Sequence, residues 1–164
     1  GTDGKAKMSK SLGNCIYLSD EPDVIKSKIM SMYTDPTHIR KEDPGHTKGN
    51  PVFTYLEAFC NPEHFKEFMP DYKNLDELKA HYERGGLGDV TVKKFLNNVM
   101  QKELEIIRER RKMWEQRLPD VYDILYQGSM KAKTVAANTL EEVKHSMKID
   151  YFENKNLLSK ENER

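Results

Sequence analysis

The chain has 164 residues, and its 27 Lys or Arg balance its 27 Asp or Glu, so the formal net charge is zero. This length fits one domain of ordinary size, and the charge balance excludes a uniformly basic body. No apolar run reaches the length of a membrane span, and Cys15 and Cys60 lack the spacing of a metal knuckle or a disulfide framework. We therefore expect no membrane segment, no bound metal and a reducing, cytoplasmic setting.

The first element is a loop that carries the sequence KMSKS, flanked by Gly4 and Gly13. Its residues are Lys7, Met8, Ser9, Lys10 and Ser11. Glycines let the backbone bend at both ends, lysines supply mobile positive charge, and serines offer short hydroxyl donors. This composition is typical of a loop that handles phosphate groups. A merely solvated basic loop, the usual explanation of Lys- and Ser-rich runs, is disfavoured because spacing, glycines and downstream sequence agree.

About six helices are predicted after the loop, separated by turns that contain proline or glycine. They cover roughly residues 19–33, 50–59, 61–69, 74–85 and 92–117, then a short helix to Gly128 and a last one from Ser129 to Met147. Pro119 is predicted to separate the longest helix, 92–117, from the short helix that follows. No strand pattern follows Leu18, so the expected fold class is all-α, a helical bundle.

Apolar residues at helical spacing are assigned to the core of this bundle. They are Ile25, Ile29, Met32, Val52, Leu56, Phe59, Phe65, Phe68, Met69, Val92, Phe95 or Leu96, Val99, Ile106 or Ile107, and Trp114. Tyr151 and Phe152 are candidates to dock the end of the chain, and residues 151–164 are expected to form a polar tail.

Two basic stretches are candidates to contact a polyanion. Residues 93–117 carry eight Lys or Arg against four Glu, and Arg108 and Arg111 cluster at helical angles. A solvated helix laced with ion pairs explains this stretch equally well. Lys131 and Lys133 lie just inside the predicted last helix, where positive charge opposes the helix dipole. The unfavourable interaction of these lysines with the helix dipole is easier to understand if they bind a phosphate or a base at that position.

Residues 1–14 resemble the KMSKS signature loop of class I aminoacyl-tRNA synthetases. The similarity continues through Met-Ser-Met-Tyr-Thr-Asp-Pro at 30–36, Tyr-Glu-Arg-Gly-Gly-Leu-Gly-Asp at 82–89 and Ile-Arg-Glu-Arg-Arg at 107–111. In this order the motifs resemble bacterial tryptophanyl-tRNA synthetases over about residues 1–152. The related tyrosyl enzymes are disfavoured, because the Thr-Asp-Pro turn and the Gly-Gly-Leu-Gly segment match the tryptophanyl pattern.

The resemblance implies a role for each residue of the motif. Lys7 and Lys10 would contact the triphosphate and act in catalysis, and the Met8 backbone would contact adenine, with Ser9 and Ser11 completing the ATP site. It implies ATP with Mg²⁺, tryptophan and tRNA(Trp) as ligands, and a homodimer. Residues 1–18 would form the loop and its exit, and residues 19–150 an anticodon-binding domain. Its tRNA contacts would come from Lys131, Lys133, Arg108 and Arg111.

One part of the family pattern is missing. The HIGH-type ATP motif and the Rossmann core precede KMSKS in the family, and no His-x-Gly-His occurs in this chain. We therefore expect a C-terminal fragment that cannot activate tryptophan alone and whose residues 1–14 are disordered without a partner. The alternative is a stand-alone tRNA-binding or interaction module derived from such an enzyme, with a vestigial loop.

Overall fold

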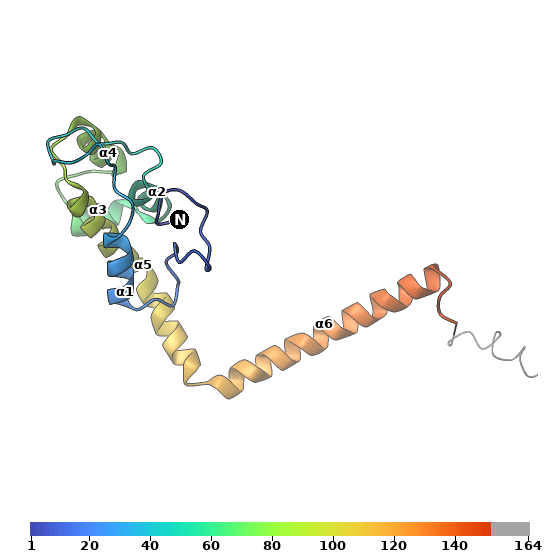
Figure 1. Ribbon diagram of the computed structural model, residues 1–164. Helices are drawn as coiled ribbons and strands as arrows, with labels where there is room; N and C mark the ends of the chain where they lie inside the picture. Colours follow the sequence, from blue (N-terminus) through green and yellow to red (C-terminus); the bar gives the residue numbers. More distant parts are fainter. Residues whose placement is uncertain (152–164) are drawn as a thin grey trace, which may run out of the picture. The chain divides into compact units, whose positions relative to one another are not determined.

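The computed structural model describes residues 1–151 and contains helices but no strand within them (Figure 1). The helices are α1 (Pro22–Met30), α2 (Pro51–Phe59), α3 (Pro62–Phe68), α4 (Leu75–Arg84), α5 (Asp89–Glu115) and α6 (Leu118–Ser146). The predicted all-α class is confirmed for this range. None of these helices combines the length and the hydropathy that crossing a bilayer requires. Phe152 and most of the expected polar tail lie outside the described residues.

The chain divides into two compact units, Gly1–Met113 and Trp114–Arg164. The first holds the N-terminal loop, α1 to α4 and most of α5, and the second holds α6. The expected division after residues 18 and 150, which places all the helices in one domain, stays a prediction.

Asparagine caps start three of the short helices, close to the predicted starts at residues 50, 61 and 74. The side chains of Asn50, Asn61 and Asn74 accept backbone N–H groups of the first turns of α2, α3 and α4. At α3 the cap is reciprocal, because the His64 side chain accepts the N–H of Asn61 at 3.1 Å. Proline occupies the start of α2 and α3, where no intrahelical N–H is needed. These ends are therefore set by local sequence.

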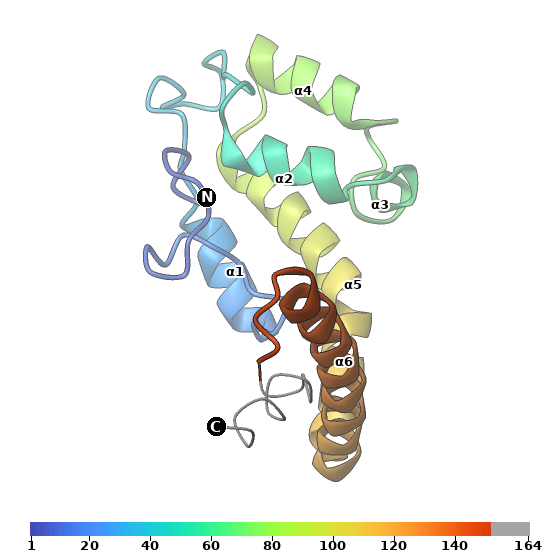
Figure 2. The same cartoon turned by 90° about the vertical axis from the view of Figure 1, so that its right-hand side faces the viewer.

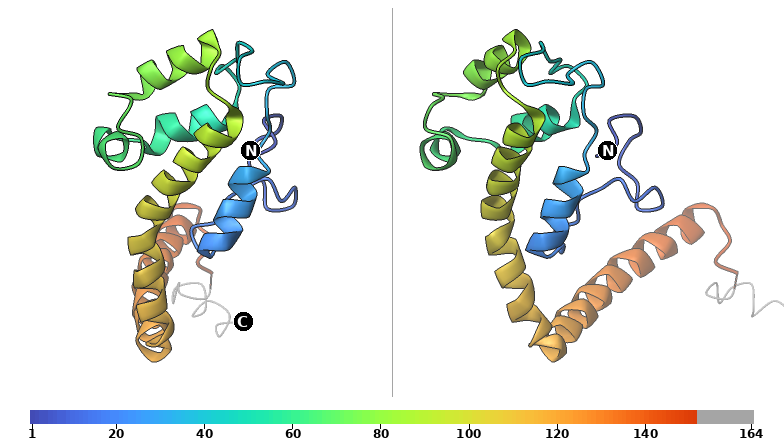
Figure 3. Two further views of the ribbon diagram at one scale, coloured as in Figure 1. Left: turned by 90° about the vertical axis from the view of Figure 1, so that its left-hand side faces the viewer. Right: turned by 60° about the vertical axis from the view of Figure 1, so that its left-hand side comes forward.

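The core of the first unit lies where α1, α2, α3 and α4 meet α5, and α1 runs beside α5 in each view of Figures 2 and 3. Its buried members are Ile25, Ile29, Met32, Val52, Phe53, Leu56, Phe65, Leu78, Tyr82, Leu87, Val92, Phe95, Leu96, Val99, Met100 and Leu104. Most predicted core positions are confirmed. Three predictions are wrong, since Phe59, both alternatives Ile106 and Ile107, and Trp114 are 37% to 57% exposed. The last three of these residues follow Leu104, the final apolar residue that α5 contributes to this core.

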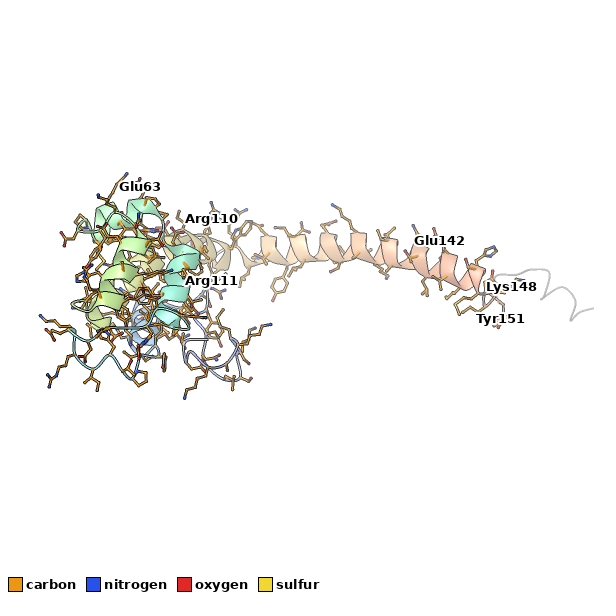
Figure 4. All side chains as sticks on the ribbon, turned by 90° about the horizontal axis from the view of Figure 1, so that it is seen from above. Glu63, Arg110, Arg111, Glu142, Lys148 and Tyr151 are labelled. Atoms are coloured by element: carbon orange, nitrogen blue, oxygen red, sulfur yellow. The ribbon has the colours of Figure 1, made fainter. Side chains whose placement is uncertain are left out.

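Helix α6 is continuous for 29 residues and buries none of them. Figure 4 shows its side chains standing out around the helix, with Glu142 labelled. The predicted break at Gly128 and the new start at Ser129 are wrong. A single interior glycine costs only about 1 kcal/mol, which the flanking turns absorb. Pro119 lies in the first turn, so it starts α6. Tyr151 is 56% exposed, and its docking stays a prediction.

Candidate functional site

The KMSKS loop is closed at its base by Asn14, which is only 5% exposed. The Asn14 side chain accepts the N–H of Ser9 at 2.8 Å and donates to the carbonyl oxygen of Lys7 at 3.3 Å. Its backbone carbonyl accepts the N–H of Thr2 at 2.9 Å. The two ends of the loop are thus joined through one residue, which the composition of the motif alone does not single out.

Asp3 orders the first turn of the same loop. Its carboxylate accepts the backbone N–H groups of Lys5 and Ala6, each at 3.3 Å, and the Asn14 amide at 3.3 Å. Desolvation opposes ionisation of Asp3, but these hydrogen bonds outweigh it and lower the pKa of the carboxyl group. The expectation that residues 1–14 are disordered for want of local partners is therefore wrong: Asp3 and Asn14 are those partners.

These hydrogen bonds hold the backbone of the motif at Ser9 and Lys7 and do not involve the side chains of those residues. Lys7 and Lys10 are exposed, and no hydrogen bond or ion pair engages their ammonium groups within residues 1–151. The hydroxyls of Ser9 and Ser11 lie 2.8 Å apart. Met8 is 54% exposed, and its sulfur accepts the Tyr55 hydroxyl at 3.2 Å. Two mobile cations therefore extend from a backbone held by hydrogen bonds.

Two cavities flank the loop on the side of residues 33–55. Their volumes are about 340 and 320 Å³, and both are lined by Gly4, Lys5 and Gly49. The second is also lined by Lys7, the first residue of the motif. Lys5 thus adds a third cation on this side of the loop.

Asp35 lines the first cavity and is 8% exposed. It accepts the Thr37 hydroxyl at 2.6 Å and the Thr37 N–H at 2.9 Å, and it contacts the backbone N–H and the ring of His46 at 2.9 and 2.7 Å. The bonds from Thr37, aided by those from His46 and opposed by desolvation, hold the pKa of Asp35 well below its ordinary value. Asp35 is therefore a buried carboxylate that fixes the Thr-Asp-Pro turn.

The two tRNA candidates on α5 differ in their exposure to solvent. Arg108 is buried at 9% exposure, and its guanidinium donates to the carbonyl of Gln101 at 3.1 Å. The side chain folds back along α5, so Arg108 presents little of its charge at the surface, and its contact with tRNA stays a prediction. Arg111 is exposed, and Figure 4 labels it together with Arg110. Arg111 stays a candidate.

The two lysine candidates of the second unit are exposed but are not at a helix start. Lys131 and Lys133 lie in the middle of α6, so the argument from the helix dipole is wrong. Residues two positions apart are separated by about 200° around a helix axis. Lys131 and Lys133 therefore point to nearly opposite sides of α6 and cannot form one compact cationic patch.

No cluster of three His, Cys, Asp or Glu within the described range is arranged to hold a metal ion. The histidines are instead committed to packing, caps or ion pairs. His64 caps α3, and His38 lies edge-on to the Tyr82 ring at 4.7 Å with Nδ1 3.0 Å from an Asp89 carboxylate oxygen. Both cysteines are free thiols. Desolvation, reinforced by the charge of Glu103, raises the pKa of Cys60 to about 11, so this thiol is not activated.

Comparison with known proteins agrees with these features. A family profile described as "tRNA synthetases class I (W and Y)" matches residues 1–105. A tryptophan–tRNA ligase of Clostridium longisporum is 60% identical over 94% of this chain and 42% of its own length. One of Lactococcus lactis is 53% identical over 93% of this chain and 42% of its own length.

Solved structures give the same assignment. The tryptophanyl-tRNA synthetase of Campylobacter jejuni matches with a TM-score of 0.70 and 28% identity, covering 90% of this chain and 43% of that chain. A second structure of that enzyme, complexed with ADP and tryptophan, matches with the same score. The chain spans about 42% of the length of the curated relatives quoted above. It belongs to the class I tRNA synthetase family of the W and Y enzymes, and the named relatives are those for tryptophan.

Proposed function

We propose that this chain is the part of a tryptophan–tRNA ligase that carries the KMSKS loop and the helices that follow it. The observation that carries the proposal is the pair of exposed ammonium groups, Lys7 and Lys10, three positions apart on a loop whose base is fixed by Asn14. The 60% identity to a tryptophan–tRNA ligase over 94% of the chain supports it.

In the activation step a carboxylate oxygen of tryptophan forms a bond to the α-phosphorus of ATP while the bond to pyrophosphate breaks. Negative charge grows on the non-bridging and leaving oxygens, and mobile cations lower its energy without covalent chemistry. Lys7 and Lys10 supply these cations, Ser9 and Ser11 supply hydroxyl donors, and the Met8 backbone contacts adenine. Mg²⁺ enters with the nucleotide, bound by its phosphates.

The helices are proposed to bind tRNA(Trp) at its anticodon stem-loop. Exposed cations neutralise phosphates, and this binding weakens as salt rises. Arg111 is the candidate on α5, and Lys131 and Lys133 are the candidates on α6. Because Lys131 and Lys133 lie on opposite sides of α6, one of them faces the RNA and the other does not. The homodimer and the cytoplasmic setting belong to the same proposal; free thiols at Cys15 and Cys60 suit a reducing compartment.

The catalytic proposal is tested in a chimaera that joins the preceding part of the Clostridium longisporum ligase to this chain. Lys7→Ala and Lys10→Ala are each expected to lower kcat for tryptophan-dependent ATP–pyrophosphate exchange about a hundredfold. Lys26→Ala, on the exposed face of α1, is the matched control and keeps full activity. Equal activity of the Lys7 and Lys10 variants and the control contradicts the proposal. This chain alone is expected to show background exchange, and tryptophan-dependent exchange by it overturns that expectation.

The tRNA proposal is tested on the same chimaera. Lys131→Glu and Lys133→Glu are made singly, with Lys26→Glu as the control, and tRNA(Trp) binding is measured at several salt concentrations. One of the two variants is expected to weaken binding and to reduce the salt slope by about 1, while pyrophosphate exchange is unchanged. Loss of exchange activity in parallel with binding, or no effect of either variant, counts against the assignment.

A further inference from the structure

A buried cation on α5 reaches the end of α1. Lys93 is 5% exposed, and its ammonium group donates to the carbonyl oxygens of Met30 at 3.1 Å and Met32 at 2.7 Å. A third bond goes to the Thr34 hydroxyl at 3.1 Å. These three acceptors match the three N–H donors of a lysine ammonium. Buried lysines usually have a carboxylate partner, whereas here backbone carbonyls and one hydroxyl take that place.

These bonds fix residues 30–34, where α1 ends and its own hydrogen bonds no longer hold the backbone. The last carbonyls of any helix have no intrahelical partner, and a cation at that end complements the helix dipole. Lys93 supplies α1 with a hydrogen-bond donor for its last carbonyl and with a positive charge at its C-terminal end. About sixty residues of sequence separate Lys93 from these acceptors. Desolvation lowers the pKa of Lys93, and the nearby Asp89 opposes this shift. The neighbouring Lys94 is exposed, which makes it a natural control.

The segment 30–34 also holds the base of the KMSKS loop. The backbone N–H of Tyr33 donates to the carbonyl of Thr2 at 2.9 Å, and the N–H of Thr2 donates to the carbonyl of Asn14 at the same distance. The Tyr33 ring packs so closely on Gly4 that an added Cβ would lie 3.1 Å from it. The Asn14 side chain in turn accepts the Ser9 N–H and donates to the Lys7 carbonyl.

We propose that Lys93 is a positioning residue for the KMSKS loop, which it anchors by clamping residues 30–34 on α5. The clamp fixes Tyr33, Tyr33 fixes Thr2 and Gly4, and Asn14 transmits that position to the backbone of Lys7 and Ser9. The loop is thereby attached to the helical core of its own unit. Its relevance to ATP rests on the proposed function, but the anchoring itself does not.

The test uses the 164-residue chain with Lys93→Met, which keeps the length of the side chain and removes the ammonium group. Lys94→Met is the matched control, and Lys93→Arg is the conservative variant. Native-state trypsin cleavage after Lys5, Lys7 and Lys10 is followed by mass spectrometry, and cleavage after Lys66 on α3 reports unfolding of the core. Hydrogen exchange of the Thr2, Ser9 and Tyr33 amides is measured in parallel.

Lys93→Met is expected to raise loop cleavage about tenfold relative to cleavage at Lys66, and to speed exchange of the three amides. Lys94→Met is expected to change neither, and Lys93→Arg to restore part of the protection. The proposal is overturned if trypsin cleavage rises equally in the loop and at Lys66. It is also overturned if cleavage and hydrogen exchange of the loop are unchanged. If Lys93→Met does not fold, Thr34→Val removes one acceptor of the clamp. It is then expected to speed Ser9 and Thr2 exchange, and unchanged exchange overturns the proposal.

In the chimaera the same substitution separates the two proposals. Lys93→Met is expected to lower kcat for pyrophosphate exchange with little change in the KM for tryptophan, because the clamp acts on the loop that is proposed to handle the triphosphate of ATP. Loop opening together with full exchange activity means that the proposed role of the loop in activation fails while the anchoring by Lys93 stands.

Discussion

The Asn14 side chain accepts the N–H of Ser9 at 2.8 Å and so closes the KMSKS loop across five residues. Its amide nitrogen simultaneously faces the Lys7 carbonyl and the Asp3 carboxylate, each at 3.3 Å. Only a side chain with both an acceptor and two donors serves these three partners. The loop geometry by itself therefore accounts for an asparagine at this position.

Asn14→Asp is expected to open the loop, since it keeps an acceptor for Ser9 but removes the donors and places a second carboxylate beside Asp3. The Ser9 amide should exchange at least about tenfold faster, which NMR-detected hydrogen exchange measures. Asn138→Asp, on the exposed surface of α6, is the control and should leave Ser9 unchanged. Unaltered Ser9 exchange in Asn14→Asp would mean that the loop is held by other contacts.

Gly45→Ala is expected to be strongly destabilising. A Cβ at Gly45 would lie 2.2 Å from the Tyr82 ring, and that ring is fully buried with its hydroxyl donating to Asp89 at 2.8 Å. The ring has no room to retreat, so we expect a loss of about 3 kcal/mol in the free energy of unfolding, measured in urea. Gly88→Ala, whose Cβ would meet Lys41 at an ordinary 3.5 Å, is the control. Similar values for both variants would contradict the steric argument.

Acid stability should depend on Asp35. Its pKa in the folded chain is lowered from 3.8 mainly by the Thr37 hydroxyl, so the unfolded state binds the proton more readily. The stabilising contribution is therefore complete above about pH 5 and is lost as the pH falls below 3.8 toward the lower folded value. Asp35→Asn should unfold about 1.5 to 3 kcal/mol more easily at pH 7 and show a flatter dependence between pH 5 and 2. Asp123→Asn on α6 is the control, and parallel pH curves for wild type and Asp35→Asn would refute the assignment.

Local signals in the sequence predicted the short helices well. The caps at Asn50, Asn61 and Asn74 act within three residues, so their meaning does not depend on the rest of the fold. The apolar spacing of Ile25 and Ile29 likewise identified a buried face. The KMSKS residues were recognisable for the same reason, because they are contiguous.

Contacts between distant segments were not predictable in this way. Nothing local distinguishes buried Lys93 from exposed Lys94, since the acceptors lie in residues 30–34. Trp114 and Ile106 have core-like spacing, yet the first core ends at Leu104. Whether these residues are buried or exposed depends on which segments pack against α5. The periodicity of apolar residues gives no information about that packing.

The two units should respond differently to loss of apolar side chains. Leu96 on α5 is fully buried, so Leu96→Ala should reduce the free energy of unfolding of the first unit by about 2 to 5 kcal/mol. Leu140 on α6 is 53% exposed, and Leu140→Ala should change stability by less than about 0.5 kcal/mol. Urea titration followed by hydrogen exchange in each unit measures both. A large effect of Leu140→Ala would show that α6 is packed within this chain.

Gly128→Ala should stabilise α6. The glycine lies inside a helix that buries no side chain, so its cost is not repaid by packing, and no atom lies within 4 Å of an added Cβ. We expect a gain of about 0.5 to 1 kcal/mol, seen as slower hydrogen exchange in the surrounding turns and higher helical circular dichroism. Ala132→Gly, one turn further along, should shift both measurements in the opposite direction. If Gly128→Ala leaves them unchanged or lowers them, the helix is interrupted at Gly128 in solution, and the division into two helices that the sequence alone predicts would be correct after all.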